Sequence, residues 1–72
     1  MSRAMWTLTI DHPDLTTTEE VHAESEGVLR MLGRAHHRQA QIVPDLRLTD
    51  PQGRVVATLD HRAADWTDRE GA

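Results

Sequence analysis

The chain has no cysteine, which excludes disulfide bonds and thiolate metal sites. No apolar run approaches the roughly 18 residues that span a membrane. The N-terminus also lacks the basic segment and apolar stretch of a secretory signal. A cytoplasmic location is therefore expected. With 72 residues there is room for one small core of marginal stability. Because covalent staples are missing, self-association is the remaining source of stability, and we expect a homo-oligomer.

Lysine, asparagine, phenylalanine and tyrosine are also absent, and all eight basic residues are arginines. The four missing types have A/T-rich codons, so the pattern indicates a GC-rich genome, bacterial or phage. The net charge is −4, from 12 acidic and 8 basic residues. This balance argues against nucleic acid as a partner, because proteins that bind nucleic acid usually carry a basic excess.

Three segments have the pattern of β-strands. Residues 5–10 alternate apolar side chains with threonines, as in a strand with one buried face. Residues 46–49 and 54–59 are two further strands, joined by Asp50-Pro51-Gln52-Gly53. Proline at the second position and glycine at the fourth suit a type I turn, so these two strands are predicted to form a hairpin.

One helix is predicted between the first strand and the hairpin. It opens within Thr16–Glu20, where threonine and glutamate have the spacing of a capping box, and continues to about Gln39 or Ala40. Gly27 and Gly33 lie off its apolar stripe. At 100° per residue the predicted stripe consists of Val21, Ser25, Val28, Leu29, Leu32, Ala35 and His36.

These elements predict an α+β fold of β-α-β-β type, with one helix packed on one face of a three-stranded antiparallel sheet. The segment 55–57 is apolar on both faces, so its strand is placed at the centre, in the order 1-3-2. Both outer strands would then be open edges. Residues 1–60 form the predicted domain. Residues 61–72 form a polar tail, partly disordered or docked through Trp66.

The helix and the segment Leu46–Leu59, with its Asp-Pro-Gln-Gly-Arg turn, resemble a group of short bacterial domains of unknown function. Those domains consist of a strand, a helix and a hairpin of the form Asp-x-x-Gly-Arg-Val-apolar-Ala-Thr. The similarity covers residues 5–60. It implies a β-α-β-β fold and no particular activity.

The sequence predicts no enzyme, no metal site and no cofactor. Five histidines are present, but the predicted fold does not bring them together. In particular, His12 and His61 follow strands predicted to run antiparallel, at opposite ends of the sheet. Cysteine and lysine nucleophiles are absent, and no Gly-x-Ser-x-Gly motif occurs. A chain this small also has little room for the desolvated pocket that pKa tuning needs.

The remaining candidate is a row of arginines on the predicted helix. Arg30, Arg34 and Arg38 recur at every fourth position, beside His37, and like charges at this spacing repel. The row is either a solvated face that complements the helix dipole or a surface that grips a partner's carboxylates or phosphates. Trp66 is the second candidate, because a large aromatic in a polar tail docks on its own domain or on a partner.

We therefore predict a small non-enzymatic protein-binding module, acting through the basic helix face or an open sheet edge. A phage-encoded or accessory inhibitor or regulator fits this description. Two alternatives stay open: a nucleic-acid-binding or antitoxin-like regulator that uses the same arginines, and a small-ligand carrier assembled from several copies.

Overall fold

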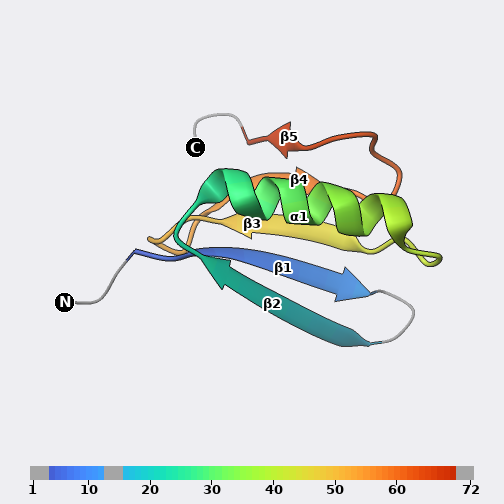
Figure 1. The fold of residues 1–72 in the computed structure, drawn as a ribbon, viewed down its shortest axis with the longest axis horizontal. Coiled ribbons are helices and arrows are strands. Elements are labelled where there is room, and N and C mark those ends of the chain that lie inside the picture. Colours follow the sequence, from blue (N-terminus) through green and yellow to red (C-terminus); the bar gives the residue numbers. More distant parts are fainter. Residues whose placement is uncertain (1–3, 13–15, 70–72) are drawn as a thin grey trace.

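The computed structural model describes residues 4–12 and 16–69. One helix lies over one face of an antiparallel sheet (Figure 1). The elements in chain order are β1 (Trp6–His12), β2 (Thr17–Ala23), α1 (Glu26–Gln39), β3 (Asp45–Thr49), β4 (Val55–Leu59) and β5 (Thr67–Asp68). The helix of the described region is too short and too polar to cross a membrane.

The sheet has five strands in the order β2-β1-β3-β4-β5, and every neighbouring pair is antiparallel. The α+β class and the helix over an antiparallel sheet are as predicted. The three-stranded β-α-β-β arrangement with order 1-3-2 is wrong. The central strand is β3, not β4, so β1 and β4 run parallel to each other. The error arose because β2 and β5 were not recognised. The apolar segment 55–57 had suggested a central strand, but β4 is flanked by β3 on one side and by the short strand β5 on the other.

The largest difference concerns residues 17–23, which were predicted to begin the helix. They form β2, paired with β1 so that Val21 lies opposite Leu8. Consecutive threonines favour extended backbone, and the ladder with β1 satisfies their backbone groups. The helix begins later, where the Ser25 hydroxyl accepts a hydrogen bond from the Val28 N–H (3.3 Å). The capping-box spacing at Thr16–Glu20 was therefore a false signal.

The predicted hairpin of β3 and β4 is present. The Gly53 N–H donates to the Asp50 carbonyl (2.9 Å), and the Asp50 carboxylate accepts from the Gln52 and Arg54 N–H groups (3.0 and 2.9 Å). Gly53 has φ = +88°, in the left-handed region. A register shift after Leu48 leaves Val56 without a partner residue on β3. This bulge explains why Val56 packs against the core cluster.

The core lies between α1 and the sheet. Its buried hydrophobic side chains are Leu8, Ile10, Leu29, Leu46, Leu48, Ala57 and Leu59. Within α1, only Leu29 and Gly33 are buried. The predicted stripe is therefore misoriented, because Val28 and Leu32 are 42% and 45% exposed while Gly33 faces the sheet. A Cβ at Gly33 would lie 3.3 Å from side-chain carbons of both Leu8 and Leu46, so the glycine lets the helix approach closely.

Candidate functional site

The arginine row contacts the end of its own chain. Residues 60–69, which we call the C-terminal arm, run from the end of β4 along one flank of α1 and add β5 to the sheet (Figure 1). Arg34 donates from Nε to Asp65 Oδ1 (2.9 Å) and Arg30 donates from Nη2 to Asp68 Oδ1 (2.6 Å). The His37 imidazole donates from Nε2 to the Asp60 carbonyl (3.0 Å). Three of the five residues nominated from sequence therefore hold this arm.

These contacts shift ionisation as expected for ion pairs. Burial acts to lower the pKa of Arg30, but hydrogen bonds and charge from Asp68 and Glu26 outweigh it and raise that pKa. The Glu26–Arg30 pair at i,i+4 is also present (2.8 Å). The Trp66 backbone N–H and the Arg34 guanidinium lower the pKa of Asp65. Arg30 and Arg34 are thus neutralised by carboxylates within the chain, which relieves the repulsion expected from their spacing.

Trp66 is held by the same helix. Its indole Nε1 donates to the Arg30 carbonyl (2.9 Å), and the Arg30 guanidinium lies 5.9 Å from the ring centroid. A Cβ at Gly33 would approach Trp66 Cζ2 to 2.7 Å, so the ring occupies the space that the glycine leaves. Arg38 is the one nominated residue outside this group, and it is exposed. The structure thus brings together Arg30, Arg34, His37 and Trp66 as intrachain contacts.

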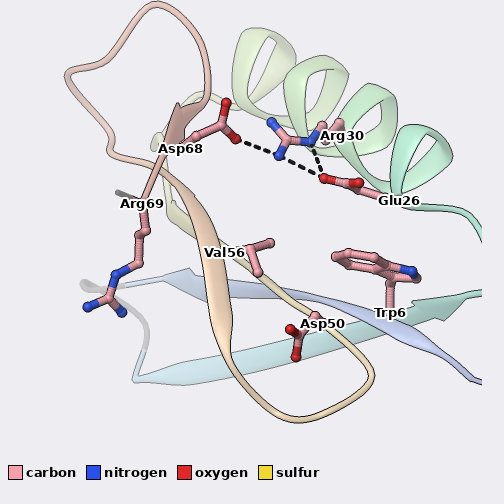
Figure 2. Close-up of a pocket in the computed structure, with 7 residues that line it drawn as sticks. All are labelled: Trp6, Glu26, Arg30, Asp50, Val56, Asp68 and Arg69. Atoms are coloured by element: carbon pink, nitrogen blue, oxygen red, sulfur yellow. Dashed lines mark hydrogen bonds and ion pairs between the residues drawn. The ribbon is translucent and has the colours of Figure 1, made fainter. Parts of the chain in front are cut away.

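A cleft of about 350 Å³ opens beside Arg30 (Figure 2). Trp6 and Val56 give it an apolar wall, and the remaining lining residues are Glu26, Arg30, Asp50, Asp68 and Arg69. Its carboxylates are already engaged, since Glu26 and Asp68 bind Arg30 and Asp50 binds the turn. The cleft therefore presents one aromatic surface, on Trp6, beside carboxylates that already have partners.

The opposite flank of α1 is apolar and uncovered. Positions two residues apart differ by about 200° around a helix, so Val28 and Leu32 lie opposite Arg30 and Arg34. Because the C-terminal arm occupies the β5 side, this flank faces the β2 side of the sheet. Met31 on the outer surface is 62% exposed. Val28, Met31 and Leu32 are thus large apolar side chains of α1 that are exposed in the described structure.

Strand β2 is the long open edge of the sheet. It has seven residues, whereas β5 at the other edge has two. Residues paired across a ladder share a face, so Val21 and Glu19 lie on the helix side, while Glu20 and His22 lie on the uncovered side. Glu20 and His22 have side chains 57% and 52% exposed. Among the described strands, only β1 pairs with β2, so the other side of β2 is an edge of the kind to which another strand can add.

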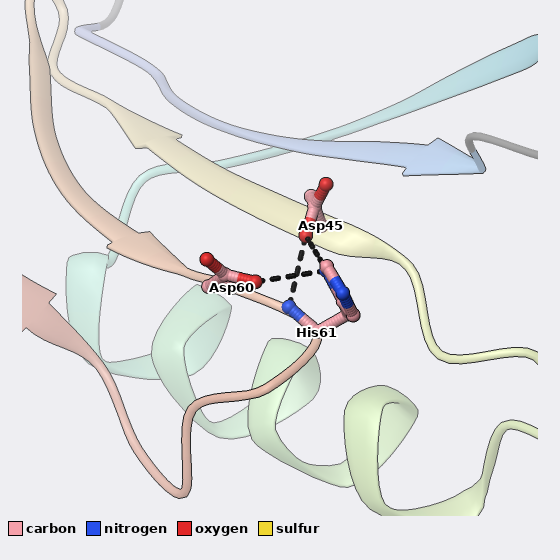
Figure 3. A group of neighbouring side chains, drawn as sticks. All are labelled: Asp45, Asp60 and His61. Carbon is pink, nitrogen blue, oxygen red and sulfur yellow. Dashed lines mark hydrogen bonds and ion pairs between the residues drawn. The ribbon is translucent and has the colours of Figure 1, made fainter.

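A third feature is a cluster of two carboxylates and an imidazole at one end of the sheet (Figure 3). His61 Nδ1 lies 3.0 Å from Asp45 Oδ1 and 2.8 Å from Asp60 Oδ1. The His61 backbone N–H also donates to Asp45 Oδ1 (2.8 Å). Hydrogen bonds from the His61 side chain and backbone lower the pKa of Asp45. Among the described residues this is the group whose ligand atoms lie within 4.8 Å of one another.

The sequence analysis missed this cluster because it paired the histidines only with one another as ligands. In the β3–β4 hairpin, Asp45 at the start of one strand meets Asp60 and His61 after the end of its neighbour. The sheet order places His12 and His61 at the same end of the sheet, so the expectation that they lie at opposite ends is wrong. The available signal was the hairpin itself, whose ends adjoin by geometry.

No family model, curated protein or solved structure matches this chain. The resemblance to short bacterial domains therefore gains no support from these comparisons. Function has to be argued from the surfaces of the structure.

Proposed function

We propose that the chain is a small non-enzymatic protein-binding module whose partner is a second copy, joined edge to edge through β2. The observation that carries the proposal is an open seven-residue edge beside an uncovered apolar helix flank. The basic row is not the basis of the proposal, because the C-terminal arm already occupies Arg30 and Arg34. The open edges predicted from the sequence, the strands within residues 5–10 and 46–49, are wrong because β1 and β3 are interior strands, and the edge used here is β2 instead.

The side chains of β2 are self-complementary in one antiparallel register. With Val21 on the two-fold axis, Val21 meets its copy, and Glu20 of each chain lies opposite His22 of the other. The alternatives with Glu19 or Glu20 on the axis would set identical carboxylates opposite each other, which destabilises a strand pair. The charges of Glu19 and Glu20 also discourage indiscriminate strand addition, a common feature of exposed edges. The Val21-centred register avoids opposing carboxylates, although the strand carries two glutamates.

The apolar flank of α1 supports the same arrangement. A two-fold axis perpendicular to the sheet keeps both helices on one side of the joined sheet. Val28 and Leu32 of the two chains then face each other across the β2 pair. A chain with this small a core gains from any further apolar burial, at about 25 cal/mol per Å².

Charge reversal and rescue test the register. In the His22→Glu variant each Glu20 would face a new carboxylate, and this occurs twice in the dimer. Cross-strand pairs contribute roughly 0.2–1 kcal/mol each, so we expect the dimer dissociation constant to rise about two- to thirtyfold. Adding Glu20→Arg to His22→Glu restores opposite charges and should restore association. Sedimentation equilibrium of the three proteins measures the effect directly.

Arg47→Glu is the matched control, since Arg47 lies on the same uncovered face but on the central strand β3. It should leave the dissociation constant unchanged. A monomer at all accessible concentrations would refute the proposal. So would a dimer that responds equally to His22→Glu and to Arg47→Glu, because that pattern reflects net charge rather than the β2 edge.

A further inference from the structure

We propose that Asp45, Asp60 and His61 form a binding site for a divalent zinc-like cation at the junction of β3, β4 and the C-terminal arm. The proposal rests on side chains remote from β2 and does not depend on association through that strand. Zinc binds imidazole nitrogen and carboxylate oxygen at about 2.0–2.2 Å and accepts a water in its fourth position. One nitrogen with two carboxylates is a donor set for such an ion, whereas magnesium and calcium prefer oxygen alone.

The cluster is already close to the dimensions of such a site. In a tetrahedral zinc site the ligand atoms lie about 3.3 Å apart, given the metal–ligand distances above. His61 Nδ1 lies 3.0 and 2.8 Å from the two carboxylate oxygens. A zinc ion would replace the Nδ1 proton, and each carboxylate oxygen would move away from Nδ1 by a few tenths of an ångström. The His61 backbone N–H continues to hold the Asp45 carboxylate in place.

The surroundings of the three ligands include a further carboxylate, one cation and an adjoining hollow. Asp11 on β1 lies directly opposite Asp45 in the ladder, and like charges in directly opposite positions destabilise a strand pair. A divalent ion at Asp45 would offset this effect. A hollow of about 260 Å³, lined by Asp45 and Asp60 and also by Arg47, adjoins the cluster and leaves room for water on the metal. The side chains of the three ligands are 44–64% exposed, so an ion has access from solvent.

The bound ion would act as a staple. Asp45 begins β3, whereas Asp60 and His61 follow β4 and begin the C-terminal arm. Binding would therefore fix the start of the arm to the sheet, in a chain that has no disulfide to do so. Because the assembled ligand set exists only in the folded chain, zinc should raise thermal stability as its concentration increases.

The test is a titration of the full chain with zinc chloride at about pH 7.5, because metal ligands bind in their deprotonated form. We expect saturation at one equivalent per chain, a rise in Tm and shifts of the His61 ring signals in NMR spectra. Asp60→Asn and His61→Gln should each weaken binding by more than about tenfold, because even the outer partners of metal ligands contribute 10–100-fold. Circular dichroism confirms that these exposed substitutions leave the fold intact.

His22→Gln is the matched control, an exposed histidine outside the cluster. It should bind zinc like the unmodified chain, whatever its effect on association, so the two proposals fail or succeed separately. The zinc proposal is overturned if binding does not saturate, if Tm stays constant, or if His61→Gln binds as tightly as the unmodified chain. Binding lost in His22→Gln but kept in His61→Gln would assign the ion to another site and would likewise overturn it.

Discussion

The substitution Gly33→Ala should have opposite effects on the free energy of unfolding in the presence and in the absence of the Trp66 ring. A Cβ at Gly33 would lie 2.7 Å from Trp66 Cζ2. Replacing glycine by alanine inside a helix stabilises it by about 1 kcal/mol. Inserting a carbon into a filled contact costs roughly 1–3 kcal/mol. In the unmodified chain we therefore expect Gly33→Ala to be neutral or to lower the free energy of unfolding by up to about 2 kcal/mol.

The sign should reverse when Trp66 is removed. Trp66→Ala alone should cost about 2–3 kcal/mol, less than a fully buried tryptophan because the ring is half-buried. In that background the nearest neighbours of the new methyl group are the Cδ1 atoms of Leu8 and Leu46, each 3.3 Å away at the end of a flexible side chain. Gly33→Ala should then be stabilising, by up to about 1 kcal/mol. The coupling between the two positions is thus about 1–3 kcal/mol, equal to the overpacking cost.

Thermal unfolding followed by circular dichroism at 222 nm measures all four proteins without depending on tryptophan signals. A difference of 1 kcal/mol shifts Tm by about 4–8 °C in a domain of this size. The reasoning is refuted if Gly33→Ala changes stability equally with and without Trp66. A clear stabilisation by Gly33→Ala in the unmodified chain would refute it as well, since the ring would then not occupy that space.

Three further outcomes follow from the structure. Ser25→Ala should lower stability by about 1 kcal/mol because it removes the N-cap of α1. Thr18→Ala, within the segment wrongly predicted to cap the helix, should leave the helical circular dichroism signal unchanged, and this signal compares the two variants. Gly53→Ala should cost about 1 kcal/mol or more because φ = +88° disfavours a side chain, which urea unfolding measures. Acidification should loosen the C-terminal arm: the pKa of Asp65 is lowered by folding, so its contribution is complete above its ordinary value of about 3.9 and is lost as pH falls through the lower folded value. The Trp66 indole N–H signal reports this step, and Asp65→Asn should remove it.

The strands with strong local signals were predictable from the sequence. Strand β1 has apolar side chains in strict alternation, and the β3–β4 turn contains proline and glycine where their φ angles require them. Strand β2 was not predictable, because an exposed edge strand has little alternation to show; Val21 is its one sizeable apolar residue. Threonine followed three residues later by glutamate there imitates a helix start. The correct cap, Ser25, is distinguished only once β2 is paired with β1.

The orientation of α1 depends on contacts that no local pattern reveals. Val28 and Leu32 satisfy helical periodicity but face solvent, while Gly33 faces the sheet because Trp66, 33 residues later in the chain, fills the space beside it. The arginine row was predicted to be either a solvated face or a surface for a partner, whereas Arg34 and Arg30 bind Asp65 and Asp68 of the same chain. The Asp45–His61 contact follows from the predicted β3–β4 hairpin, and it was missed because the histidines were paired only with one another as ligands.

In the proposed dimer two copies join through β2, with Val21 on the two-fold axis. An isotope-filtered NOE spectrum of a mixed sample, in which one population of chains is labelled and the other is not, detects this contact. We expect intermolecular contacts centred on Val21, with Glu20 of one chain near His22 of the other. Intermolecular contacts confined to β4 and the C-terminal arm would contradict this expectation. So would the absence of intermolecular contacts at concentrations where sedimentation shows a dimer, or the absence of a dimer in sedimentation.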